Sequence, residues 1–135
     1  KAKRTFRAVT KAIDSGLVRS CHDLSEGGLA VASAEMAFAG GYGLQLDLSK
    51  VPGKGLERND FTLFSESNSR FLLEVSEQDR EDFEAQMKNK PCARIGTVTK
   101  EERLVINGLS KKMVVDASLA ELRRSWKKTF GGEPK

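Results

Sequence analysis

The sequence is poor in the residues that carry much of enzyme chemistry. Its 135 residues include one histidine, two cysteines, one tryptophan and one tyrosine. The single histidine, His22, excludes a metal site built from several histidines within this chain. Cys21 and Cys92 lie far apart and lack the short paired spacing of zinc and redox motifs. We therefore expect free thiols and a reducing, cytoplasmic location.

Long apolar runs and a one-signed charge pattern are also missing. Hydrophobic residues make up 39% of the chain and charged residues 31%, with no stretch long enough for a membrane span. The formal charge is +4, but basic residues are interleaved with 19 acidic ones. This mixture argues against a nucleic-acid-binding surface. The start at Lys1 is followed by no signal segment. We expect the chain to be a C-terminal piece of a larger protein.

The hydrophobic pattern alternates between helical and strand periods along the chain. Helices are expected over 4–15, 28–39 and 77–88, and after a cap at Asp116 or Ser118. Strands are expected over 17–21, 44–48, 70–75, 92–99, 103–107 and 111–115, and 59–68 is expected to be irregular or briefly helical. The last two strands flank Asn107-Gly108, a strong hairpin signal.

This order predicts an α+β fold with a mixed sheet and helices packed on it, rather than a purely parallel sheet. Residues 1–16 are expected to form a connector or first helix, and 17–130 a single α+β domain. The glycine-rich residues 131–135 are expected to be a disordered tail.

The first candidate site is the polar loop that precedes the helix expected at residue 28. A strand-to-helix loop leaves backbone N–H groups free at the helix start, where a phosphate could bind. His22 either holds the loop or binds a ligand, and Asp23 either takes a metal ion that bridges to phosphate or accepts loop N–H groups. Ser25 is either a helix cap or a phosphate contact, and Gly27 and Gly28 allow close approach of the backbone.

The second candidate site is the loop before the strand expected at residue 70. Hydroxyls, an acid and a guanidinium gather there, in Ser65, Glu66, Ser67 and Arg70. The alternative is a solvated turn with ordinary serine and asparagine turn chemistry. Inside the apolar helix before it, Glu35 is either on the helix's wet edge or buried against a partner.

These two loops together carry a family resemblance. The chain resembles the second C-terminal domain in the synthetase subunits of the phosphoribosylformylglycinamidine synthase family. The resemblance is carried by residues 22–31, 34–40, 63–67 and 70–75, and more loosely by 95–98. It implies the C-terminal α+β fold of the aminoimidazole ribonucleotide synthetase superfamily, in which an ATP-binding domain precedes this one. It also implies an ATP-dependent carbon–nitrogen ligase of purine biosynthesis, which makes formylglycinamidine ribonucleotide from formylglycinamide ribonucleotide and glutamine-derived ammonia.

The resemblance implies roles for residues and partners as well. Positions matching Asp23 and Ser25 contact Mg²⁺ and an auxiliary nucleotide, ATP or ADP, in long members of the family. His22, Gly27, Gly28, Ser65, Glu66, Ser67 and Arg70 complete the expected nucleotide or phosphate contacts. The implied partners are the preceding ATP-binding domains of the same chain, a glutaminase and a small bridging subunit, as in the short form of the enzyme.

No catalytic residue is expected within this chain, and the chain alone is expected to be inactive. Two alternatives stay open. One is the equivalent domain of aminoimidazole ribonucleotide synthetase or selenophosphate synthetase. The other is a non-catalytic docking module for a glutaminase or bridging subunit.

Overall fold

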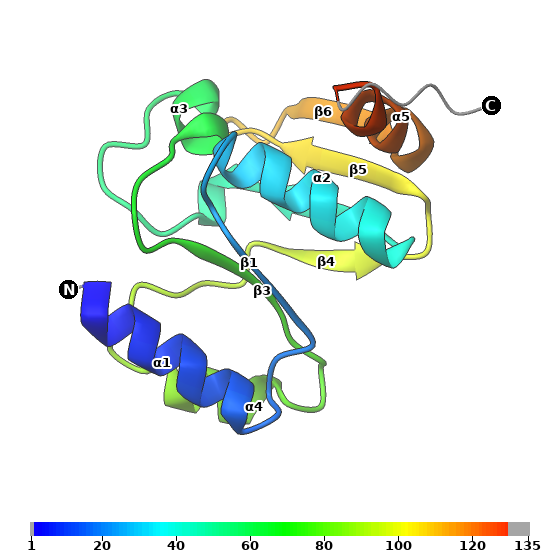
Figure 1. Cartoon of the computed structure of the whole chain (residues 1–135). Helices are drawn as coiled ribbons and strands as arrows, with labels where there is room; N and C mark the ends of the chain where they lie inside the picture. The colour runs from blue at the N-terminus through cyan, green and yellow to red at the C-terminus, as the bar shows by residue number, and fades with distance from the viewer. Residues whose placement is uncertain (1, 130–135) are drawn as a thin grey trace.

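The computed structural model describes residues 2–129, which form two sheets and five α-helices (Figure 1). The larger sheet has the strand order β4-β2-β5-β6, and the smaller one pairs β1 with β3. The strands are β1 (Ser20–Asp23), β2 (Gly43–Asp47), β3 (Phe71–Glu74), β4 (Gly96–Thr99), β5 (Arg103–Asn107) and β6 (Met113–Ser118). The helices are α1 (Ala2–Asp14), α2 (Gly28–Gly40), α3 (Asn59–Phe64), α4 (Arg80–Gln86) and α5 (Leu119–Thr129), with a 3₁₀ turn at Leu48–Lys50.

The larger sheet is mixed, which confirms the predicted α+β class. β2 runs parallel to β5, whereas β4 pairs with β2 and β6 with β5 in antiparallel fashion. The parallel pair is possible because a long connection through α3, β3 and α4 separates the two strands. β5 occupies the predicted residues 103–107 and forms the predicted hairpin with β6. The expected tail at 131–135 lies outside the described residues.

The main core lies where α2 and α5 meet the larger sheet. Helix α2 contributes Leu29 and Ala32, and the sheet contributes Leu46, Leu104 and Ile106, all of which are buried. Removing these apolar side chains from water supplies the main driving force for folding here. Helix α2 buries Leu29, Ala32 and Ala37, whereas Ala39 near its end is exposed. Helix α2 lies along one side of the larger sheet in Figure 1.

A second, smaller core lies between α1, α4 and the two-stranded ribbon. Its buried residues are Val9 and Ala12 of α1 with Phe83 and Met87 of the α4 region. Phe71, Leu73 and Val75 pack against it from one face of β3, as the alternation predicts, whereas Leu72 packs against the main core. The ribbon of β1 and β3 therefore separates the two cores and belongs to both.

Several predicted boundaries were wrong because a strand needs a pairing partner. The first strand begins at Ser20 rather than at residue 17, since its partner β3 ends at Glu74. Residues 92–95 are not a strand, since β4 begins at Gly96, although the Asp47 amide at the end of β2 still donates to the Ile95 carbonyl oxygen at 2.8 Å. β6 runs over 113–118 rather than 111–115, and Ser118, not Asp116, caps α5. Asp116 instead forms an ion pair with Arg103 across the hairpin.

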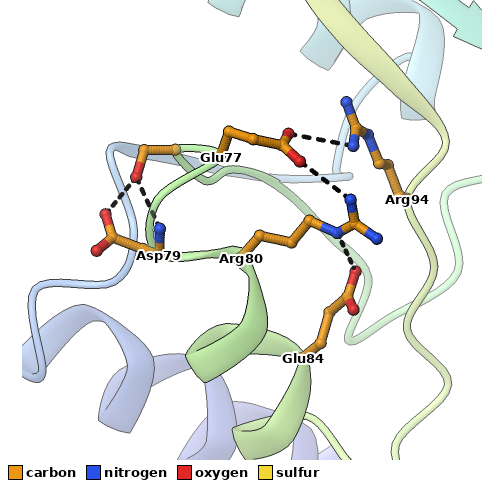
Figure 2. Close-up of polar contacts among 6 residues, drawn as sticks. Glu77, Asp79, Arg80, Glu84 and Arg94 are labelled. Carbon is orange, nitrogen blue, oxygen red and sulfur yellow. Dashed lines mark hydrogen bonds and ion pairs between the residues drawn. The ribbon is translucent and has the colours of Figure 1, made fainter.

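Helix α4 begins at Arg80 rather than at residue 77, because charged side chains organise the preceding turn (Figure 2). The Glu77 carboxylate accepts from Arg80 Nη1 at 3.0 Å and from Arg94 Nη1 at 3.2 Å, and Arg80 Nε also donates to Glu84 at 3.1 Å. Ser76 Oγ accepts from the Asp79 amide at 3.1 Å, a capping bond that forms ahead of the helix. The Glu77–Arg94 bond ties the α4 region to the segment that leads into β4.

Candidate functional site

The polar loop between β1 and α2 brings the backbone unusually close to a second segment. Gly27 and Gly28 have φ values of 75° and 60°, a left-handed conformation that glycine adopts at little cost. A Cβ on Gly28 would lie 2.7 Å from the carbonyl oxygens of both Leu63 and Ser65. The start of α2 therefore lies directly against the end of α3, and only a glycine at position 28 allows this contact.

The two predicted loops meet through a carboxylate. Glu66 Oε1 accepts a hydrogen bond from the Gly27 amide at 2.9 Å. The Gly27 amide, predicted to be free for a phosphate, is thus bound to Glu66 of the same chain. A carboxylate is favourable there because the start of a helix is the positive end of its dipole. Ser25 does not cap α2 with its side chain; its carbonyl accepts from the Gly28 amide at 3.1 Å. Ser25 itself is exposed.

The second loop is held by its own arginine. Arg70 Nη1 donates to the Ser65 carbonyl oxygen at 2.9 Å, and the hydroxyls of Ser65 and Ser67 are 2.8 Å apart. Arg70 is partly buried, and burial lowers the pKa of its guanidinium from the ordinary value. A hollow of about 680 Å³ is lined by Ser65, Ser67 and Arg70 together with Phe61 and Phe64 of α3. Hydroxyls, a guanidinium and aromatic rings therefore face one space.

His22 is tied into a chain of hydrogen bonds rather than standing free. Its Nε2 lies 2.8 Å from Glu35 Oε2, and its Nδ1 lies 2.6 Å from the carbonyl oxygen of Asp23. The other oxygen of Glu35 accepts from Trp126 Nε1 at 3.0 Å. Of the two alternatives for Glu35, the structure shows contact with a partner, although the Glu35 side chain is only half-buried.

Asp23 projects its carboxylate toward solvent beside this chain. Its side chain is 63% exposed, and its Oδ1 is 3.7 Å from His22 Nδ1. Across residues 2–129, no three His, Cys, Asp or Glu side chains gather closely enough to hold a metal ion between them. Asp23 can thus contribute one ligand to Mg²⁺, which usually keeps several waters and binds substrate phosphates as well. A cage made of protein ligands alone does not exist in this part of the chain.

The predicted residues fall into two groups that meet at the start of α2, where Gly28 lies against the Ser65 carbonyl oxygen. His22, Asp23, Ser25, Gly27 and Gly28 come from the β1–α2 side, and Ser65, Glu66, Ser67 and Arg70 from the α3–β3 side. The Glu66–Gly27 hydrogen bond joins them. Sequence reasoning missed Trp126 as a partner of this region, because no local pattern connects residues 91 positions apart. The unexplained acid in the apolar α2 sequence was the only signal for this contact.

A larger cavity of about 900 Å³ adjoins these loops, since Leu24, Ser69 and Arg70 are among its wall residues. It lies between the two cores and is lined by residues of α1, the ribbon, the α4 region and the edge of the larger sheet. The ion pairs of Glu77 with Arg80 and Arg94 lie on its wall. None of the helices within residues 2–129 is both long and apolar enough to cross a bilayer.

A mixed four-stranded sheet, a separate two-stranded ribbon and two loops that converge at the start of α2 define a C-terminal domain of the aminoimidazole ribonucleotide synthetase type. The family described as AIR synthase related protein, C-terminal domain, matches residues 1–108. The chain belongs to this family.

Curated relatives share much of the sequence. The chain is 41% identical over 128 residues to the phosphoribosylformylglycinamidine synthase subunit PurL of Alkaliphilus metalliredigens, covering 93% of this chain and 16% of the relative. It is 37% identical over 123 residues to the subunit of that name from Thermococcus sibiricus, covering 91% of this chain and 17% of the relative. The chain thus spans about a sixth of the length of these relatives.

Solved structures share the fold at lower identity. PurL of Thermotoga maritima in complex with FGAR matches with a TM-score of 0.79 and 22% identity, over 90% of this chain and 20% of that one. The hydrogenase maturation protein HypE matches with a TM-score of 0.68 and 20% identity, over 83% of this chain and 41% of that one. The resemblance predicted from the sequence is therefore confirmed, and the same fold occurs in proteins with other tasks.

Proposed function

We propose that this chain is the second C-terminal domain of the synthetase subunit of phosphoribosylformylglycinamidine synthase. The observation that carries this proposal is the 41% identity to a PurL subunit over 128 residues. The whole protein is then an ATP-dependent ligase of purine biosynthesis in the cytoplasm. It converts formylglycinamide ribonucleotide and glutamine-derived ammonia to formylglycinamidine ribonucleotide. The chain alone has no activity, because the groups that activate the amide oxygen lie in other domains.

Within that protein, the β1–α2 loop serves an auxiliary nucleotide site. Asp23 supports this role because its carboxylate is 63% exposed at the end of a strand, where it can reach a metal ion outside the domain. A bound Mg²⁺ would neutralise the negative charge of the nucleotide phosphates. The exposed Ser25 hydroxyl lies two residues farther along the same loop and can donate to a phosphate oxygen. ATP or ADP and Mg²⁺ are the proposed ligands of this loop.

The α3–β3 loop forms the second wall of the same ligand region. Only one guanidinium nitrogen of Arg70 is used by the Ser65 carbonyl bond, so its remaining donors can serve an anion. The neighbouring hydroxyls of Ser65 and Ser67 bond each other at 2.8 Å, so the pair can offer one further hydroxyl hydrogen in the same hollow. Glu66 holds the two loops at a fixed distance through Gly27 rather than contacting the ligand.

The proposed partners are the preceding ATP-binding domains of the same chain, a glutaminase and a small bridging subunit. One structural relative, described as PurLQS from Thermotoga maritima, supports assembly of this kind. The outer side of α5 is a candidate for such contacts, since Arg123, Arg124, Lys127 and Lys128 are all exposed there. A charged surface of one sign favours a partner of opposite charge.

The ligand proposal is tested on the longer protein that contains this chain. Mg²⁺ and ADP are titrated together onto the wild type, onto Asp23→Ala and onto Asp14→Ala, an exposed aspartate at the end of α1 that serves as control. We expect the Asp23 variant to lose about tenfold or more in affinity and the control to bind as the wild type does. Equal affinity in all three would give Asp23 a purely structural role.

The inactivity of the chain alone has a separate test. The 135-residue chain is supplied with ATP, Mg²⁺, formylglycinamide ribonucleotide and ammonia, and amidine formation is measured. No product is expected above the uncatalysed rate. Turnover by this chain would overturn the proposal that the reacting groups lie in other domains.

A further inference from the structure

We infer that Glu35 is a positioning residue that couples helix α5 to the ligand loop between β1 and α2. Glu35 lies in the middle of α2 and uses one carboxylate oxygen for each neighbour. Oε2 is 2.8 Å from His22 Nε2 on β1, and Oε1 is 3.0 Å from Trp126 Nε1 on α5. The inference rests on the proposed function, because that function is what makes the β1–α2 loop a ligand loop.

The coupling follows from the chemistry of the carboxylate. Hydrogen bonds to an ionised acceptor are about twice as strong as those between neutral groups. Glu35 and His22 each have side chains that are 29% exposed, so solvent only partly screens the pair. Because one carboxylate holds both donors, a shift of Trp126 reorients the acceptor that His22 uses. Three separate elements therefore share one rigid group.

The loop responds because His22 is also bonded to it. The ring contacts the carbonyl oxygen of Asp23 through Nδ1, and the carboxylate of Asp23 is 3.7 Å from the same nitrogen. A rotation of the imidazole thus moves the backbone that presents Asp23. The path runs from Trp126 through Glu35 and His22 to Asp23. A molecule that binds α5 and shifts Trp126 would alter the ligand loop without touching it.

One substitution can break the path with little change in packing. The Trp126 ring lies 5.9 Å from the ring of Phe38, centroid to centroid. Trp126→Phe retains an aromatic ring for that contact and removes the N–H that bonds Glu35. Lys127→Gln changes the exposed side of the same helix and serves as the matched control.

The first test is amide hydrogen exchange on the 135-residue chain without ligand. The reporters are the hydrogen-bonded amides of Leu24, Gly27 and Gly28, with Ile106 of the buried sheet as reference. In Trp126→Phe we expect exchange at the loop amides to rise about tenfold while Ile106 is unchanged. The control should match the wild type. Loop exchange equal to the wild type, or an equal rise at Ile106, would overturn the coupling.

The second test runs in the opposite direction, since coupling between two sites is reciprocal. Trp126 is the single tryptophan of the chain, so its fluorescence reports on α5 alone. His22→Ala is expected to shift the emission of Trp126, and Cys21→Ala, which alters the neighbouring position of β1, is expected to leave it in place. An unchanged emission in His22→Ala would also overturn the inference.

The two tests use no nucleotide, so they separate this inference from the proposed function. Coupling in the chain together with no binding of Mg²⁺ and ADP by the longer protein would overturn the ligand assignment alone. Binding that depends on Asp23, together with loop exchange insensitive to Trp126→Phe, would overturn the coupling alone.

Discussion

The substitution Gly28→Ala tests the contact on which the candidate site depends. Gly28 is buried at the start of α2 with φ of 60°, and its α-carbon faces the backbone of the α3 end. An added Cβ would lie 2.7 Å from two carbonyl oxygens and 2.9 Å from the carbonyl carbon of Phe64. These neighbours are backbone atoms, so they cannot rotate away as a flexible side chain would.

Two effects add in this variant. Left-handed backbone costs an alanine about 1–2 kcal/mol relative to glycine, and forcing atoms into a packed site costs about 1–3 kcal/mol more. We therefore expect a loss of about 2–5 kcal/mol in the free energy of unfolding. Gly16→Ala is the matched control, because Gly16 has φ of 72° but no atom within 4 Å of the added Cβ. It should cost only the backbone term, about 1–2 kcal/mol.

The measurement is urea unfolding of both variants and the wild type, followed by far-UV circular dichroism. The difference between the two alanine variants isolates the close approach of α2 to α3. A Gly28→Ala variant that is no less stable than Gly16→Ala would refute the apposition of the two loops. In that case the Glu66–Gly27 hydrogen bond would also lose its structural basis.

Three further predictions concern other parts of the domain. Arg80 and then Arg94 lower the pKa of Glu77 from its ordinary value of 4.5. The stabilising effect of Glu77 is therefore present above pH 4.5 and is lost as the pH falls through the lowered pKa. NMR titration of the Glu77 carboxyl should show its pKa rise in Arg94→Gln, and no rise would contradict the ion pair. Phe83→Ala should cost about 3–5 kcal/mol in urea unfolding, because Phe83 is buried in the second core; a cost below about 1 kcal/mol would mean that this core contributes little. Ser118→Ala should cost about 1 kcal/mol in thermal unfolding, since Ser118 Oγ accepts from the Glu121 amide at 3.2 Å, and an unchanged midpoint would exclude that cap.

The sequence predicted most reliably those elements whose signals are local. β5 matches residue for residue because its alternation is clear. The Asn107-Gly108 signal indicated the hairpin but not its turn, since the loop runs over 108–112 and its left-handed residue is Lys111 with φ of 62°. Helix α2 matches within one residue, since Gly41 caps it and its amide donates to the Ala37 carbonyl at 2.9 Å. The segments 17–19 and 92–95 were misassigned because their apolar residues resemble those of strands. The sheets reach them through the bonds Arg19 N–Glu74 O and Asp47 N–Ile95 O, at 2.8 Å each, but do not continue along them as strand ladders. Strand pairing depends on the whole fold and cannot be predicted from the local sequence.

The candidate site was predictable as two segments but not as one arrangement. Spacing and residue type pointed to Asp23 and to the loop that contains Glu66. That Glu66 would bond the amide of Gly27, 39 positions earlier, follows only from the approach of α3 to α2. Likewise, the acid at position 35 signalled a partner, but Trp126 could be identified only once α5 lay beside α2.

The two faces of the β1–β3 ribbon have a consequence for how the domain folds and fails. A two-stranded hairpin or ribbon alone is at best marginally stable in water. Here Leu72 packs on the main core while Phe71 and Leu73 pack on the smaller one, so the ribbon loses half its support if either core melts. The smaller core therefore cannot unfold locally without also destabilising the ribbon. Its melting would expose an apolar strand face beside Asp23, so damage near α1 or α4 would spread to the β1–α2 loop as local unfolding.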